Sequence, residues 1–237
     1  MSSILPLSLR KVSLSRGGKR ILGPIDFELG GRGLSVVIGP NGAGKSTLLR
    51  LMHGLERPSE GALAWAVPLK TARKAQAFVF QSPVMLRRSL VENLAFPLRL
   101  SGRPRTEAAK VAMDWAARLG LSGQGDQPAW QLSRGERQKL ALARALITEP
   151  EILFLDEPTA SLDGHATREI EALLGVARDR GMRIVLATHD MGQARRLADE
   201  VVFLLGGSLH ETGPAKAFFH GPQTAAAAAF LRGDIVT

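Results

Sequence analysis

The segment Gly39-Pro-Asn-Gly-Ala-Gly-Lys-Ser-Thr47 constrains the fold more than any other part of this 237-residue chain. It matches the pattern G-x-x-x-x-G-K-[ST], in which glycine-rich backbone turns several N–H groups inward around a chain of phosphates. The apolar run Leu34–Ile38 precedes the segment, and the helix-compatible run Thr47–His53 follows it. We therefore expect a strand, a phosphate-binding loop and a helix N-terminus in direct succession. The chain is predicted to bind a nucleoside triphosphate.

Every residue of this loop is a candidate contact for the nucleotide. Lys45 can reach the β- and γ-phosphates, and the hydroxyl of Ser46 can bind Mg²⁺. The positive end of the helix that follows adds to the attraction for phosphate. The predicted nucleotide contacts are Gly39, Pro40, Asn41, Gly42, Ala43, Gly44, Lys45, Ser46 and Thr47.

Composition excludes several other classes of protein. The chain has no cysteine, which rules out disulfides and cysteine metal sites. No run approaches the ~20 apolar residues that span a bilayer, and the first ten residues do not resemble a signal peptide. Net charge is +9, with arginines scattered along the chain. A solvated basic surface is the simpler interpretation, and nucleic-acid binding is the alternative.

Short apolar runs alternate with helix-compatible segments over most of the chain, which predicts a parallel sheet wrapped by helices. The first two runs, joined at Gly17-Gly18, are expected to form a small separate β-layer. The expected strands are Leu7–Leu14, Ile25–Leu29, Leu34–Ile38, Glu60–Ala66, Ala77–Phe80, Glu151–Asp156, Met182–Ala187 and Val201–Leu205, and the expected helices are Glu107–Leu119, Ala166–Arg180 and Gln193–Ala198. Residues 82–140 lack strand patterns and are predicted to be a helical insertion, in which Ser133 and Glu136 can form a capping box.

Two acids stand at the end of a second buried strand. Asp156 and Glu157 follow the apolar run Ile152–Leu155, and ligands of parallel sheets bind at the carboxyl ends of the strands. Asp156 is placed to hold Mg²⁺, directly or through water. Glu157 can orient and deprotonate a water molecule that attacks the terminal phosphate.

The segment Leu132-Ser-Arg-Gly-Glu-Arg-Gln138 resembles the hallmark of the ATP-binding-cassette (ABC) ATPases, a Leu-Ser-Gly-Gly-Gln-like sequence that opens a helix. Leu132, Ser133 and Gly135 match it, whereas Arg134 replaces a glycine and Glu136 stands where glutamine is commonest. The resemblance implies ATP and Mg²⁺ as cofactors, and a homodimer in which Ser133 and Gly135 close over ATP bound to a second copy.

Other elements of this family follow in the expected order. Gln81 comes after an apolar strand and matches the glutamine that meets Mg²⁺ and the γ-phosphate. Asp163 matches a loop that contacts the dimer partner, and His189 matches the histidine that contacts the γ-phosphate. With Glu157 and Lys45, His189 and Gln81 are therefore implied to act in catalysis. At the place of the usual adenine-stacking aromatic stands Arg16, which can stack on the base or can be only a turn residue.

The resemblance implies an α/β fold of the P-loop NTPase class, with a RecA-like core, a mixed sheet, a small antiparallel β-layer and a helical subdomain. We expect a single ABC ATPase domain over residues 1–237, with its core at 1–82 and 141–237 and its helical subdomain at 83–140. One short cassette without zinc modules, long coiled coils or membrane spans favours a separate ATPase subunit of a transporter.

The stretch after Gln81 is similar to the importer-type subunits, in which it forms a groove for the permease. Pro83, Val84, Met85 and Leu86 are expected to form an exposed apolar patch there, and local packing in the core is the alternative. The resemblance implies an ATPase on the inner face of the cell membrane, bound to a transmembrane permease and assisted by a substrate-binding protein, with no nucleic-acid partner. Small oxyanions such as tungstate, molybdate or phosphate are the expected cargo. The alternative is a soluble ABC-type ATPase acting on nucleic acid or ribosomes.

Overall fold

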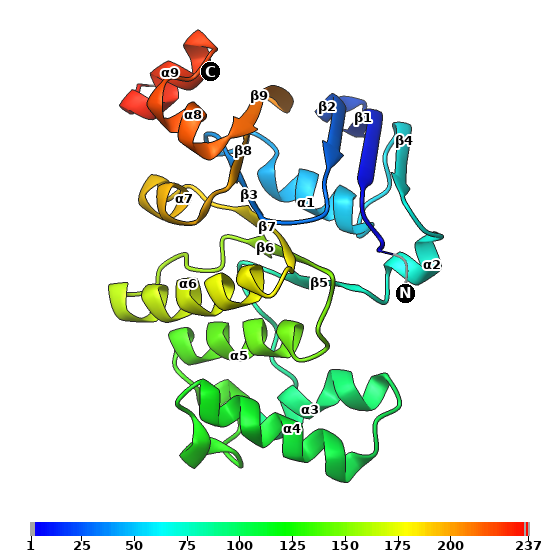
Figure 1. The fold of residues 1–237 in the computed structure, drawn as a ribbon, viewed down its shortest axis with the longest axis vertical. Coiled ribbons are helices and arrows are strands. Elements are labelled where there is room, and N and C mark those ends of the chain that lie inside the picture. The colour runs from blue at the N-terminus through cyan, green and yellow to red at the C-terminus, as the bar shows by residue number, and fades with distance from the viewer. Residues whose placement is uncertain (1–2, 235, 237) are drawn as a thin grey trace. The chain divides into compact units, whose positions relative to one another are not determined.

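A computed structural model describes residues 3–234 and residue 236, and the chain divides into two compact units. The first unit comprises the described part of Met1–Phe78, Glu151–Glu157 and Gly175–Thr237. The second comprises Val79–Pro150 and Pro158–Leu174. Figure 1 shows the elements of both units.

A mixed sheet forms the centre of the first unit. Within the described residues its strand order is β5-β6-β7-β3-β8-β9. Strands β6, β7, β3 and β8 run parallel, and β9 pairs antiparallel to β8. The strands are β3 (Leu34–Ile38), β5 (Gln76–Val79), β6 (Ile152–Asp156), β7 (Arg183–Ala187), β8 (Glu200–Leu205) and β9 (Ser208–Pro214).

The parallel strands of this sheet are buried on both faces, as continuous apolar runs predict. All five residues of β3, β6 and β7 are buried. The register pairs Val36 with Leu186, and Leu155 with that same Leu186. The carboxyl ends of β3 and β6 therefore lie on either side of the end of β7, at the edge where parallel sheets bind ligands.

A second, antiparallel sheet also belongs to the first unit. It has the order β2-β1-β4, with β1 at Leu7–Arg16, β2 at Lys19–Leu29 and β4 at Glu60–Trp65. The turn at Gly17-Gly18 joins β1 to β2, because both glycines adopt positive φ values, 54° and 77°. The predicted small antiparallel β-layer is confirmed.

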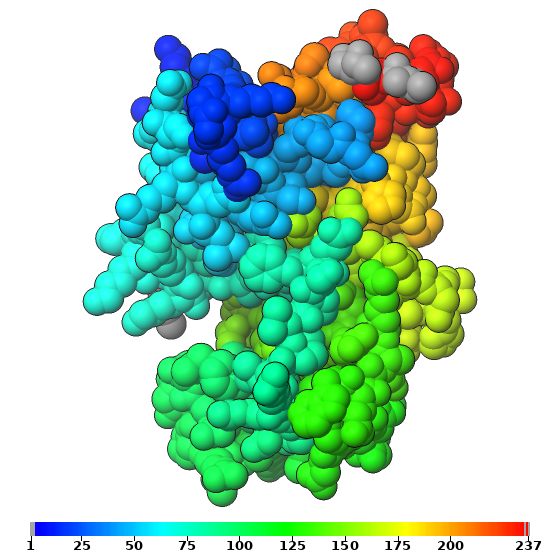
Figure 2. Space-filling model, turned by 180° about the vertical axis from the view of Figure 1, so that it is seen from behind, coloured from blue at the N-terminus to red at the C-terminus, as the bar shows by residue number. Residues whose placement is uncertain are grey.

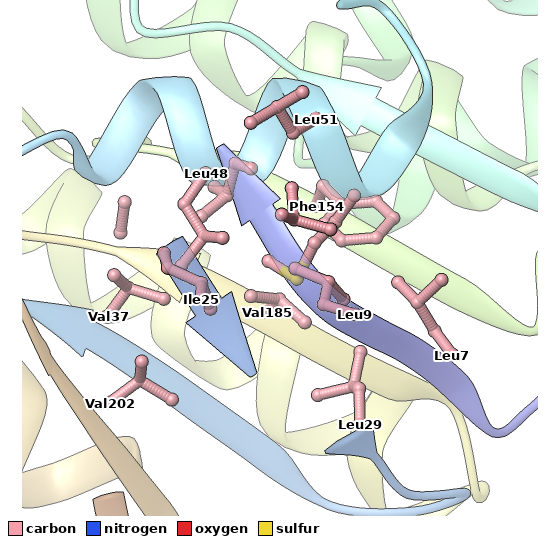
Figure 3. Packing of buried hydrophobic residues seen from close by; sticks show 14 of the residues in the cluster. Leu7, Leu9, Ile25, Leu29, Val37, Leu48, Leu51, Phe154, Val185 and Val202 are labelled. Carbon is pink, nitrogen blue, oxygen red and sulfur yellow. The ribbon is translucent and has the colours of Figure 1, made fainter. Parts of the chain in front are cut away.

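Helix α1 (Lys45–His53) packs between the two sheets. Its buried leucines join side chains from β1, β2, β3, β6 and β7 in one apolar cluster, which Figure 3 shows around Leu48 and Leu51. Burial of such side chains contributes about 1.5–3 kcal/mol each. This packing fixes the start of α1, and with it the end of the phosphate loop.

The remaining helices of the first unit are short. They are α2 (Leu69–Ala72), α7 (Met191–Leu197), α8 (Ala215–His220) and α9 (Ala225–Arg232). Neither α8 nor the strand β9 was predicted from the sequence. In Figure 2 the blue N-terminal strands and the orange and red C-terminal helices all contribute to the surface of this unit.

The second unit is helical. It contains α3 (Leu90–Leu100), α4 (Arg105–Arg118) and α5 (Arg134–Leu146), with single 3₁₀ turns at Ser122–Gln124 and Ala129–Gln131. Leucines and alanines of the three helices form its core. No strand is present among its described residues beyond the last residue of β5, as predicted. The division of the chain passes through α6 (Gly164–Asp179).

The boundaries of the helical unit differ from the predicted range 83–140. The predicted end of the helical unit, residue 140, falls inside α5, which continues unbroken to Leu146. The second unit extends to Pro150 and also includes Pro158–Leu174. The reason is that the helical core continues past residue 140, because Ala143 of α5 and Ile147 directly after it pack in that core together with Leu140. Among the described residues, no helix is both long enough and apolar enough to cross a membrane.

His53, the last residue of α1, is enclosed by aromatic rings in the first unit. Its imidazole meets Phe78 and Phe154 edge-on, with ring centroids 5.4 and 5.8 Å away. Its Nδ1 atom is buried and has no hydrogen-bond partner among the described residues. Burial, and secondarily the positive charge of Arg73, lowers the pKa of His53 to about 4.

This histidine is predicted to make the fold sensitive to acid. Between about pH 6.5 and pH 4 the unfolded chain binds a proton at His53 that the folded chain does not, so stability falls as pH falls through that window. The loss approaches about 3 kcal/mol at pH 4, at 1.36 kcal/mol per pKa unit. Denaturant unfolding of His53→Leu should show a flatter dependence on pH in this window. His220→Leu, at an exposed helix end, is the control and should keep the wild-type slope; an unchanged slope in His53→Leu contradicts the assignment.

Candidate functional site

The phosphate loop runs from the end of β3 to the start of α1, as its sequence predicts. Two of its glycines are required by close packing. A Cβ atom on Gly39, whose φ is 148°, would lie 2.1 Å from the carbonyl oxygen of Leu204, and one on Gly44 would lie 2.8 Å from Leu22. The backbone can therefore follow this path only because these positions lack side chains. The turn is closed by a hydrogen bond from the Ala43 amide to the Pro40 carbonyl, 3.2 Å.

The Lys45 ammonium lies inside the curve of the loop. Its Nζ atom donates to the carbonyl oxygens of Gly39 at 2.8 Å and Pro40 at 3.0 Å. The residue is only 7% exposed. Burial lowers the pKa of Lys45, against the opposing charges of Glu157 and Asp156. A phosphate chain seated on this loop would meet a positive charge held at its centre.

Ser46 and Asp156, the two predicted Mg²⁺ ligands of the first unit, are in direct contact. The hydroxyl of Ser46 donates to Oδ1 of Asp156 at 2.7 Å, although 110 residues separate them. Asp156 is the buried last residue of β6. Burial raises the pKa of Asp156, opposed by the Ser46 hydrogen bond and the Arg50 charge. One carboxylate and one hydroxyl at this spacing are hard oxygen donors of the kind that hold Mg²⁺ together with phosphates.

Glu157 follows Asp156 in the chain and contacts His189, another predicted catalytic residue. Nδ1 of His189 lies 3.1 Å from Oε1 of Glu157, and the Glu157 side chain is mostly buried whereas that of His189 is 59% exposed. Glu157 has φ 47°, an uncommon conformation for a residue with a side chain. Its amide donates to the Ala187 carbonyl at 2.9 Å, which holds the acid beside the end of β7. Strain of this kind concentrates at functional sites.

Arg50 is a further residue of this site and was not predicted from the sequence. Its guanidinium lies 3.8 Å from Asp156 Oδ2 and 3.9 Å from Glu56. Arg50 stands on α1 one turn after Ser46, so both side chains face the end of β6. The sequence did contain a signal for this role, because Arg50 follows Ser46 by four positions and therefore lies on the same face of the predicted helix.

Arg16, the candidate for stacking on adenine, forms an ion pair. Its Nη2 atom lies 2.6 Å from Oε1 of Glu56, and its side chain is 58% exposed. The residue sits at the end of β1, next to the turn Gly17-Gly18. The ion pair with Glu56 neither supplies nor excludes a base contact, so the stacking role of Arg16 stays a prediction.

Ser133, Gly135 and Asp163 lie in the second unit, around one open pocket of about 380 Å³. The rest of its lining includes Lys139, His165 and Glu169. Nζ of Lys139 lies 3.1 Å from Glu169, and Nδ1 of His165 lies 3.4 Å from that same carboxylate. The structure thus brings these three predicted contacts together at the N-terminal end of α5, where backbone N–H groups favour an anion.

Glu136, a departure from the family sequence, has a local structural role. The Glu136 amide donates to Ser133 Oγ at 3.3 Å, and the Ser133 amide donates to Glu136 at 2.8 Å. This is the predicted capping box, and these hydrogen bonds lower the pKa of Glu136. Arg134, the other departure, is exposed at the first position of the helix.

Gln81 is exposed and follows β5 directly. Its predicted contact with Mg²⁺ and the γ-phosphate stays a prediction. The apolar patch expected after it is smaller than predicted. Val84 is 76% exposed, but Met85 packs against the helical core, and Pro83 and Leu86 are partly buried.

Comparison with known proteins gives a consistent set of relatives. The profile of the family described as "ABC transporter" matches residues 22–160, more than half of the chain. A "Probable anion import ATP-binding protein" of Haloferax volcanii is 34% identical over 252 residues, covering 97% of this chain and 88% of the relative. The phosphate import ATP-binding protein PstB 2 of Natronomonas pharaonis is 35% identical over 97% of this chain and 87% of its own length. The methionine import ATP-binding protein MetN of Xanthomonas oryzae is 40% identical over 89% of this chain and 67% of its own.

Solved structures with the same fold are also found. The structure of cbiO1 from Clostridium perfringens, described as part of the ABC transporter complex cbiONQ, has a TM-score of 0.80 and 27% identity. It covers 95% of this chain and 94% of that one. An ATP-binding subunit of an ABC transporter has a TM-score of 0.82 at 24% identity, which shows the fold alone.

Proposed function

This chain belongs to the ABC transporter family as an ATP-binding subunit of the importer type, and we propose that it powers uptake of a small oxyanion through a membrane permease. Subunits of this type are ATPases. The observation that carries the proposal for the chemistry is the cluster of Lys45, Ser46, Asp156 and Glu157 at one edge of the sheet. The nucleic-acid alternative rests on net charge alone.

The proposed reaction assigns a separate task to each residue. The loop amides and Lys45 bind the β- and γ-phosphates of ATP and neutralise their charge. The Glu157 carboxylate accepts a proton from water as the water oxygen attacks the γ-phosphorus and the bond to the β-phosphate oxygen breaks. His189, 3.1 Å from Glu157, orients that carboxylate and contacts the γ-phosphate. Ser46 and Asp156 would hold Mg²⁺, which supplies charge stabilisation at the phosphates.

The proposed catalytic unit is a homodimer that sandwiches ATP. The pocket around Ser133, Gly135 and Asp163 offers a hydroxyl and free helix N–H groups for an anion. An ATP held by a second copy would supply that anion. The pocket is broad enough for a triphosphate, since small-molecule sites typically have volumes of about 300–1,000 Å³.

Glu157→Gln tests the chemistry and the dimer together. The amide cannot accept the proton, so ATP hydrolysis should fall about 100- to 10,000-fold, while ATP binding is retained because Glu157 does not hold the phosphates. Unhydrolysed ATP should trap the dimer, visible by size-exclusion chromatography with light scattering. Glu171→Gln, on α6, is the control and should hydrolyse ATP normally. Wild-type turnover in Glu157→Gln contradicts the assignment of Glu157, and a monomer with bound ATP contradicts the sandwich.

The proposed permease contact is the segment after Gln81, centred on Val84. Val84 is 76% exposed and Phe80, four residues earlier, is 41% exposed, so two exposed apolar side chains stand on either side of Gln81 in the sequence. Exposed apolar side chains that occur together, rather than singly, suit a protein interface. A contact here would hold the chain at the inner face of the cell membrane.

Val84→Asp should separate docking from catalysis. A charge at an exposed site changes stability by only about 0.5 kcal/mol, so basal ATPase activity should survive. An unpaired carboxylate in an apolar interface should weaken binding to a permease that co-purifies with this chain by about 30-fold or more, a hot-spot loss. Affinity is measured with purified permease in lipid nanodiscs. Val176→Asp, at a valine that is 52% exposed, is the control and should bind normally; normal binding by Val84→Asp excludes this surface.

The proposed oxyanion cargo follows the names of two relatives, the anion and phosphate import proteins, which are 34% and 35% identical and align over 97% of this chain. The methionine import protein of Xanthomonas oryzae is 40% identical over 89% of this chain, so an amino acid is the competing class of cargo. A substrate-binding protein is proposed as the carrier of the anion to the permease. Uptake of labelled phosphate, molybdate and methionine by cells lacking this chain tests the class of cargo. Loss of phosphate or molybdate uptake is expected, whereas loss of methionine uptake alone would mean that the cargo is an amino acid.

A further inference from the structure

The segment Val84–Ser89 has no regular secondary structure, yet its backbone is held by two side chains of the helical unit. It connects β5 to α3. The two side chains are Asn93, on α3, and Arg144, on α5. The phosphate-loop chemistry uses neither of them.

Asn93 is fully buried and binds the segment through both ends of its amide. Oδ1 accepts from the Leu86 amide at 3.0 Å, and Nδ2 donates to the carbonyl oxygens of Leu86 at 3.2 Å, Arg88 at 3.3 Å and Ser89 at 2.9 Å. Because donors surround Oδ1 and acceptors surround Nδ2, only one orientation of this amide fits. A carboxylate here would face three carbonyl oxygens.

Arg144 adds a charged contact at the other end of the segment. Its Nη2 atom donates to the carbonyl oxygen of Val84 at 2.7 Å, and Nη1 donates to Oδ1 of Asn93 at 3.2 Å. Hydrogen bonds from a charged donor are roughly twice as strong as neutral ones. The planar guanidinium therefore fixes the Val84 backbone and the Asn93 amide together.

The far end of the segment is also fixed. The side chain of Ser89 caps α3 and forms a capping box with Glu92. The Ala129 amide donates to the carbonyl oxygen of Arg88 at 3.0 Å. Between these points the Val84 side chain remains exposed, so the segment presents its side chain outward on a rigid backbone.

We infer that Arg144 and Asn93 are positioning residues that hold Val84–Ser89 in one conformation, so that a permease meets a preformed surface. This inference rests on the proposed docking function. It also connects the two sites of the helical unit. Ser133 caps the start of α5, and Arg144 lies 11 residues further along the same helix, which is about 16.5 Å at 1.5 Å per residue. Movement of α5 by nucleotide at the Ser133 pocket would carry the Val84 backbone with it.

Hydrogen exchange of the isolated chain tests the positioning directly. Arg144→Met should raise amide exchange within residues 84–88 about tenfold or more, the effect of losing a charged hydrogen bond, and should speed tryptic cleavage after Arg87. ATP binding and basal ATPase activity should not change. Arg144→Lys, which keeps the positive charge but loses the forked geometry of the guanidinium, should give an intermediate rate of exchange. Arg105→Met, at an exposed arginine of α4, is the control. Unchanged exchange in Arg144→Met overturns the inference.

A double-mutant cycle with the purified permease separates this inference from the proposed function. Arg144→Met should weaken binding about tenfold alone, yet add little in the Val84→Asp background, because both act through the same segment. If Val84→Asp weakens binding and Arg144→Met does not, positioning by Arg144 is contradicted and the docking surface stands. If Val84→Asp binds normally, the docking surface fails, and the role of Arg144 in docking fails with it.

Discussion

The hydrogen bond between the Ser46 hydroxyl and the Asp156 carboxylate, 2.7 Å long, is the contact on which the site in the first unit depends. It joins the first turn of α1 to the end of β6, two strands away from β3 in the sheet. The loop lies between β3 and α1, so this bond fixes the loop relative to the acidic strand end. Burial raises the pKa of Asp156, and a divalent cation bound there would favour the charged carboxylate again.

The second unit supplies a different kind of site. The Ser133–Glu136 capping box fixes the start of α5, and the pocket beside it gathers Gly135 and Asp163. The contacts of Arg144 with Val84 and Asn93 then tie the later turns of α5 to the exposed segment after β5. One helix therefore has the proposed nucleotide contact at one end and the proposed permease contact near the other, which is a physical basis for coupling them.

The sequence predicted best what depends on local chemistry. Leu34–Ile38 was predicted with its exact bounds because a strand buried on both faces is a continuous apolar run. Strand β9 was missed because its residues are polar and half-exposed, and its pairing with β8 is tertiary. The Glu157–His189 contact joins residues 32 positions apart, so only the family resemblance brought them together. Asn93 was missed because a single asparagine in a helical stretch has the pattern of a surface residue, and only the fold shows that it is buried.

The dependence of ATP binding on Mg²⁺ tests the central claim most directly. The affinity for ATP is measured by calorimetry for the wild type and for Asp156→Asn, each with and without Mg²⁺. The comparison distinguishes the contribution of the metal ion to binding from that of the phosphate loop. If Ser46 and Asp156 hold the ion, Asp156→Asn should bind ATP with wild-type affinity when Mg²⁺ is absent. When Mg²⁺ is present, the increase in affinity should be about 10- to 100-fold smaller in Asp156→Asn than in the wild type. The same gain from Mg²⁺ in both proteins would contradict the account.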